Sequence, residues 1–128
     1  MAKRKTKVFR RSKFEDDFEA LLKVNKIAYE YEPKDKILTY DIPSSLHKYH
    51  PDFCIGDTIF ETKGLFDLTD RAKILHLKRC HPNKRLVMVF QNANTKIYKG
   101  SPTSYSMWCN KNNVEWCTIK TISTKLPL

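Results

Sequence analysis

The chain has 128 residues with 41% hydrophobic content, and its seven Phe, six Tyr and two Trp are enough for the packed core of one globular domain. It carries 24 Lys and Arg against 14 Asp and Glu, and the net charge of +10 favours a polyanionic partner, above all nucleic acid. No stretch approaches the roughly 18 apolar residues of a membrane span, and no apolar segment follows the basic N-terminus as in a signal peptide, so we expect a cytoplasmic protein without a membrane partner.

Residues 1–11 form a basic segment that contains no acid. We predict a flexible N-terminal arm that either stays solvated or follows a phosphate backbone. An anionic membrane surface is a poorer partner, because the segment lacks the apolar face of an amphipathic anchor. Residues 12–128 are predicted to form a single domain. The candidate DNA-binding side chains of the arm are Lys3, Arg4, Lys5, Lys7, Arg10 and Arg11.

The first regular element is predicted to be an amphipathic helix over residues 13–26, with Ser12 as its N-cap. Acidic side chains crowd its first turn, where the helix dipole favours negative charge. The apolar stripe of this helix comprises Phe14, Phe18, Leu21 and Leu22.

Alternating apolar residues predict strands over 27–32 and 36–42, and the stretch 43–51 is rich in turn-forming residues and is expected to connect them to the next hairpin. A helix is predicted over 68–81, with Leu68, Ala72, Leu75 and Arg79 along one side.

The continuous apolar run at 85–90 is typical of a strand buried on both faces. A short helix within 101–113 and a strand over 114–119 complete the chain. This order predicts an α/β (α+β) fold, a mixed sheet flanked by helices.

The cysteines lie far apart and form no C-x-x-C pair, which predicts reduced thiols packed as small apolar side chains. Zinc binding is an alternative, because His76 and Cys80 are four residues apart on a predicted helix and His81 or His50 could join them.

The segment "HPDFCIGDTIFETKG", residues 50–64, reads as a hairpin with its turn at Gly56 and Asp57. The simplest register pairs Phe53 with Phe60 and therefore sets Asp52 opposite Glu61, with Lys63 on the same face as Glu61. Either the hairpin is exposed and Lys63 neutralises both acids, or a divalent cation does so in a buried hairpin.

The apolar residues of the hairpin favour burial, and two hard carboxylates on adjacent strands suit Mg²⁺. A metal held by Asp52 and Glu61, with Lys63 beside it, predicts metal-dependent hydrolysis of a phosphodiester.

These residues carry a resemblance to known families. Pro51, Asp52, Glu61 and Lys63 match the P-D…(D/E)-x-K pattern of restriction-endonuclease-like nucleases. The stretches "HPDF", "ETKG", "DRAK" and "TKIYKGSPTSY" resemble the phage endonuclease I family of Holliday-junction resolvases, and the resemblance extends from about Phe9 to Trp116.

The resemblance implies a restriction-endonuclease-like fold, a strand-swapped homodimer, and cleavage of branched DNA by a phage or prophage protein acting in the host cell. It implies one or two Mg²⁺ per site, with Mn²⁺ as a substitute. It adds Glu15 as a catalytic and metal-binding residue beside Asp52, Glu61 and Lys63, although on the residues alone Glu15 reads as an ordinary acid of a helix N-terminus.

The expected function is therefore a structure-selective, metal-dependent endonuclease for four-way junctions. A sequence-specific or repair nuclease of the same fold, and a catalytically idle DNA-binding module, are the alternatives. Basic residues outside the arm are predicted to line the DNA path, although each could belong to a solvated face. They are His47, Lys48, Arg71, Lys73, Lys96 and Lys99.

Overall fold

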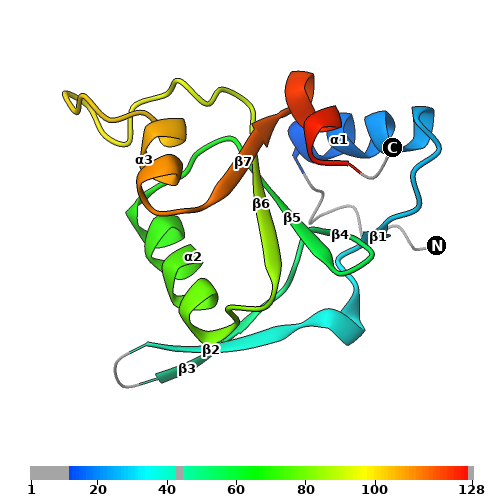
Figure 1. Cartoon of the computed structure of the whole chain (residues 1–128), viewed down its shortest axis with the longest axis horizontal. Helices are drawn as coiled ribbons and strands as arrows, with labels where there is room; N and C mark the ends of the chain where they lie inside the picture. The colour runs from blue at the N-terminus through cyan, green and yellow to red at the C-terminus, as the bar shows by residue number, and fades with distance from the viewer. Residues whose placement is uncertain (1–11, 43–44, 127–128) are drawn as a thin grey trace, which may run out of the picture.

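The structure, a computed structural model, describes residues 12–42 and 45–126 (Figure 1). The predicted basic arm lies outside these residues. A five-stranded sheet with the order β1-β4-β5-β6-β7 forms the centre of the fold, and β2 and β3 form a separate two-stranded sheet. The strands of the larger sheet are β1 (Glu30–Tyr31), β4 (Phe53–Ile55), β5 (Thr58–Lys63), β6 (Arg85–Phe90) and β7 (Glu115–Thr118).

The larger sheet is mixed, as the sequence predicts. β4 is antiparallel to both β1 and β5, whereas β5, β6 and β7 run parallel to one another. The parallel register sets Lys63 opposite Phe90, so the C-terminal ends of β5 and β6 lie at the same edge.

Helices cover both faces of this sheet (Figure 1). On one face, α1 (Lys13–Val24) and the 3-10 helix η3 (Ile119–Thr124) pack on side chains that include Phe53 and Phe60. On the other face, α2 (Leu68–Cys80) and α3 (Tyr105–Lys111) pack on a second cluster that includes Met88 and Phe90. The predicted α/β architecture is confirmed.

The first helix forms as predicted. Ser12 accepts a hydrogen bond from the backbone of Glu15, and the Glu15 side chain accepts one from the backbone of Ser12, which completes a capping box. Phe14, Phe18 and Leu22 are buried, and the ring of Phe18 lies edge-on to Phe53 at 4.9 Å.

The predicted buried side of α2 is wrong. Leu68 and Leu75 are 72% and 39% exposed, and the helix instead buries Arg71, Ile74 and Leu77. The reason is that Arg71 occupies a core-facing position, where its guanidinium finds backbone carbonyls, so apolar periodicity alone selects the wrong face.

The stretch 43–51, expected to be a turn-rich connection, contains a strand. β2 (Leu38–Ile42) pairs antiparallel with β3 (Ser45–Tyr49), and Leu38 stands opposite Tyr49. A 3-10 turn, η2 (Lys34–Lys36), precedes β2, and a contact of 2.6 Å between His81 Nε2 and the Thr39 carbonyl ties β2 to the end of α2.

The four cysteines are free thiols, and Cys54, Cys109 and Cys117 are buried, as predicted. Within residues 12–42 and 45–126, the zinc ligands considered above form no cluster. None of the helices in this part of the chain is long and apolar enough to cross a membrane.

Candidate active site

The β4–β5 hairpin has the predicted register, with Phe53 opposite Phe60. Asp52 lies just before β4, and its side chain turns towards Thr62 rather than pairing with Glu61. The backbone N–H and the hydroxyl of Thr62 both donate to Asp52 Oδ2, at 3.0 and 3.1 Å. Because both bonds end on Oδ2, they fix the direction of the carboxylate, and in the described part of the chain Oδ1 accepts no hydrogen bond and can face a ligand.

Asp52 belongs to a cluster with Glu15 and Glu32, whose nearest carboxylate oxygens all lie within 4.8 Å of one another. Glu15 comes from the capped first turn of α1, and Glu32 follows β1 with a positive φ of 46°. The Glu32 N–H donates to the Asp52 carbonyl at 2.8 Å, which holds the two residues together. Three carboxylates offer the hard oxygen ligands that Mg²⁺ or Mn²⁺ takes, so these residues fit such an ion.

Glu61, which the sequence grouped with Asp52 and Glu15, lies outside this three-residue cluster. It is 4% exposed, and the buried Tyr49 hydroxyl donates to its Oε1 at 2.5 Å. Burial, followed by the negative charge of Asp52, raises the pKa of Glu61 to about 8, while the Tyr49 hydrogen bond and Lys73 oppose the rise. Asp52 therefore links the cluster to Glu61 electrostatically.

Burial also raises the pKa of Asp52 above its ordinary value, and the charge of Glu32 adds to the rise. The two hydrogen bonds from Thr62 and the nearby charge of Lys63 act in the opposite direction. A divalent cation would remove the penalty of keeping these carboxylates ionised together.

Lys63 ends β5 and forms an ion pair with Asp70 of α2, with 3.0 Å between Nζ and Oδ1. Burial alone would lower the pKa of Lys63, but Asp70 and the charges of Glu61 and Asp52 raise it above the ordinary value. The side chain therefore stays an ammonium group, suited to stabilising negative charge and not to accepting a proton.

The basic residues predicted to bind DNA have different environments. Lys48, Lys96 and Lys99 are exposed. Lys73 lies with its Nζ 5.6 Å from the centre of the Tyr49 ring, close enough to lower the pKa of Glu61. The backbone of His47 lies in β3, and its side chain is outside the described atoms.

Arg71 differs from these lysines because it is 7% exposed. Its guanidinium donates to the carbonyls of Phe66 and Ile97, at 2.8 and 3.3 Å. These contacts favour a structural role, so we leave Arg71 out of the proposed DNA surface.

Sequence reasoning missed Glu32, Tyr49, Thr62 and Asp70 as parts of this site. The acid at the end of "YEYE" is a visible signal, but the positive φ that turns Glu32 towards Asp52 is not. Tyr49 and Asp70 lie on elements that are distant along the chain, and only the packing of β3 and α2 brings them to Glu61 and Lys63.

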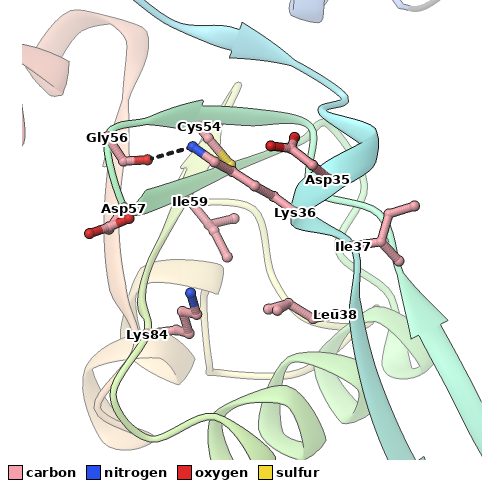
Figure 2. A pocket seen from close by; sticks show the side chains of 9 residues that line it. All are labelled: Asp35, Lys36, Ile37, Leu38, Cys54, Gly56, Asp57, Ile59 and Lys84. Carbon is pink, nitrogen blue, oxygen red and sulfur yellow. Dashed lines mark hydrogen bonds between the residues drawn. The ribbon is translucent and has the colours of Figure 1, made fainter.

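A small pocket lies at the other end of the hairpin, by its turn (Figure 2). Its lining includes Lys36, whose Nζ donates to the Gly56 carbonyl at 3.2 Å, together with Cys54 and Lys84. The cavity volume of about 140 Å³ is below the range of roughly 300–1,000 Å³ typical of small-molecule sites. The acid cluster, at the opposite end of β4 and β5, is therefore the stronger candidate for chemistry.

A mixed sheet that carries clustered carboxylates, with an ammonium group at the same strand end, defines a nuclease-type site. The chain matches the phage endonuclease I family over residues 1–125. It is 42% identical to the endonuclease I of Escherichia phage T7 over 107 residues, which cover 83% of this chain and 70% of that protein. It is 43% identical to endodeoxyribonuclease 1 of Enterobacteria phage T3 over 105 residues, 81% of this chain and 68% of that protein. The chain belongs to the phage endonuclease I family.

Proposed function

We propose that this protein is a metal-dependent endodeoxyribonuclease that hydrolyses phosphodiesters in branched DNA, four-way junctions foremost. The observation that carries the proposal is the cluster of Glu15, Glu32 and Asp52 in a chain whose net charge is +10. The names of the phage T7 and T3 relatives support the reaction class. The resemblance of "TKIYKGSPTSY" to junction-resolving members of the family supports the choice of branched DNA.

In this proposal Asp52, Glu15 and Glu32 hold Mg²⁺, or Mn²⁺ in its place, and Glu61 adds a carboxylate once it has lost its proton. Such an ion, when bound, polarises a phosphoryl oxygen and lowers the pKa of a bound water. Thr62 keeps Asp52 oriented. Lys63, held by Asp70, stabilises the negative charge that develops on the phosphate.

DNA is proposed to reach this site over exposed cations, which neutralise phosphates without reading sequence. Lys48, Lys96 and Lys99 are the exposed candidates among the described residues, and the half-buried Lys73 is a further one. The basic segment 1–11 adds more cations in the sequence. We place the reaction in the cytoplasm of the infected cell.

We further propose a homodimer in which the segment before residue 43 is exchanged between subunits. This segment carries α1, β1 and β2, and therefore both Glu15 and Glu32, whereas Asp52 and Lys63 follow it. Exchange would preserve every contact within each half while building each site from two chains. A two-fold dimer also presents two identical sites, which matches the paired scissile phosphates of a four-way junction.

The proposal is tested by incubating the protein with a labelled four-way junction and a linear duplex of the same sequence, with Mg²⁺ or with EDTA. We expect cleavage of the junction only, and only with Mg²⁺. Asp52→Asn should slow cleavage by at least about a hundredfold, because it removes a ligand charge. Its affinity for the junction, measured in Ca²⁺, should stay within about twofold of wild type, since phosphate contacts supply most of the binding.

The matched control is Asp57→Asn, which removes an exposed carboxylate at the hairpin turn, away from the cluster. It should cleave like wild type. Equal cleavage of junction and duplex would overturn the structure selectivity, and parallel loss of binding and cleavage in Asp52→Asn would overturn the metal-binding role.

A further inference from the structure

The segment between β6 and α3, residues 91–104, exposes an aromatic ring between two cations. It projects beside α3 and is coloured yellow to orange in Figure 1. Tyr98 is 62% exposed, and Lys96 and Lys99 on either side of it are exposed as well. Among the described aromatic side chains, Tyr98 is the one that is exposed, so its ring offers an uncovered face beside two cations.

The tip of this segment is a hydrogen-bonded turn. Ser101 N–H donates to the Tyr98 carbonyl at 3.1 Å, and Gly100 has a φ of 88°, the positive value that the third residue of a type II turn requires. Ile97 N–H donates to the Thr103 carbonyl at 2.9 Å below the turn. The ring of Tyr98 is therefore held in solvent by an ordered backbone, and binding to it would need little additional ordering.

The same segment is attached directly to the candidate active site. It begins at Gln91, whose N–H donates to the Lys63 carbonyl at 3.4 Å. Arg71 then bridges the Ile97 carbonyl of this segment and the Phe66 carbonyl, three residues after Lys63. These contacts fix the position of the turn relative to Lys63. A ligand that lies across the site at Lys63 therefore meets the turn at a defined position.

We propose that Tyr98 stacks on a base exposed at the branch point of DNA bound in this site, while Lys99 contacts a neighbouring phosphate. This inference rests on the proposed function and deepens it, because it names a feature that selects branched DNA. In a linear duplex both faces of every interior base are covered by neighbours, whereas the base pairs at the centre of a junction whose arms are unstacked expose a face on which an aromatic ring can stack. Lys96 also donates to the Pro102 carbonyl at 3.3 Å, so Lys99 is the cation less engaged within the turn.

The test compares Tyr98→Ala with Tyr98→Phe, which keeps the ring and removes only the hydroxyl. Dissociation constants are measured in Ca²⁺ for a four-way junction carrying 2-aminopurine at the point of strand exchange, and for the matched linear duplex. We expect Tyr98→Ala to bind the junction about tenfold more weakly and the duplex within about twofold of wild type. Tyr98→Phe should behave like wild type, and the change in 2-aminopurine fluorescence on binding should be lost only with alanine.

A second variant, Lys99→Ala, separates stacking from charge. It should weaken junction and duplex binding alike and reduce the slope of log affinity against log salt by about one. The stacking role is overturned if Tyr98→Ala binds the junction like wild type, or if it weakens junction and duplex equally.

Cleavage by the wild-type protein distinguishes a failure of the role of Tyr98 from a failure of the proposed function. If the wild type cuts the junction with Mg²⁺ and Tyr98→Ala shows no junction-specific loss, only the role of Tyr98 fails. If the wild type cuts neither substrate, the proposed function fails and this inference fails with it.

Discussion

At the scale of single residues, the acids of the candidate site differ in how their charge is compensated. Asp52 receives two hydrogen bonds from Thr62 and lies close to Lys63. Within the described residues, Glu61 is compensated by the Tyr49 hydroxyl and by the charges of Lys73 and Lys63, and it is almost fully buried. Without a metal, Glu61 is therefore held largely as the neutral acid at pH 7, and metal binding should release its proton.

Glu61→Gln should flatten the pH dependence of stability in the metal-free protein. The folded-state pKa of Glu61 is raised from 4.5 to about 8, so the folded state binds more protons than the unfolded state between these values. The free energy of unfolding should fall as pH rises through this window, by up to about 1.4 kcal/mol per pH unit, and level off above it.

Urea denaturation at pH 5 to 9 in EDTA measures this slope. Glutamine keeps the oxygen that accepts from Tyr49 and removes the titration, so the variant should gain stability over wild type as pH rises. Asp57→Asn, at the exposed turn, should keep the wild-type slope. Parallel curves for Glu61→Gln and wild type would mean that Glu61 is not the titrating group.

Local parts of the candidate site could be predicted from the sequence, whereas contacts between distant elements could not. The hairpin register and the capped helix are local features, and both form as predicted. Glu15 lies close to Asp52, and the charge of Lys63 acts on Asp52. Glu32 was not predicted because its contribution depends on one positive φ, and the contact of Glu61 with Tyr49 was not predicted because Tyr49 lies on a strand that is distant along the chain. Such long-range contacts leave no periodic signal in the sequence.

At the scale of elements, α2 shows where pattern reasoning fails. A buried arginine lies on the inner face of the helix, while leucines at other positions remain exposed, so the apolar stripe gave the wrong orientation. The strands of the larger sheet were easier to predict, because continuous apolar runs such as residues 85–90 fit a strand buried on both faces. β3 was missed because its polar residues resemble a loop, and only its pairing with β2 identifies it as a strand.

The orientation of α2 can be tested with two leucines of the same helix. Leu77 is 3% exposed and Leu75 is 39% exposed. Leu77→Ala should lower the free energy of unfolding by about 2–5 kcal/mol through lost burial and a cavity. Leu75→Ala should change it by less than about 1 kcal/mol, as expected for a largely solvated side chain. Urea denaturation at a fixed pH provides both values, and a larger loss for Leu75→Ala would restore the face predicted from periodicity.

At the scale of the whole molecule, the arrangement of site residues along the chain separates them into two groups. Glu15 and Glu32 precede residue 43, and Asp52, Glu61 and Lys63 follow residue 45. The small β2–β3 sheet lies between the two groups in the chain, and its two described strands pair with each other and not with a strand of the larger sheet. If β2 separates from β3 of its own chain, the acids before residue 43 can join the residues after 45 of another chain. The contacts of each site stay unchanged, which is the basis of the proposed exchange.

The exchange predicts complementation between two inactive variants. Glu15→Gln and Lys63→Ala homodimers should each fail to cut a four-way junction. In a mixed dimer with exchanged segments, one site receives both lesions and the other receives Glu15 from one chain and Lys63 from the other, so nicking of the junction should return at one site per dimer.

The measurement uses differently tagged chains, unfolded and refolded together, with the mixed dimer purified through both tags. A mixture of Glu15→Gln with Glu32→Gln is the control, since both acids travel on the same segment and no site can recover in either arrangement. If each site is built from a single chain, every site of the Glu15→Gln and Lys63→Ala mixture keeps one lesion, and the purified mixed dimer will leave the junction uncut.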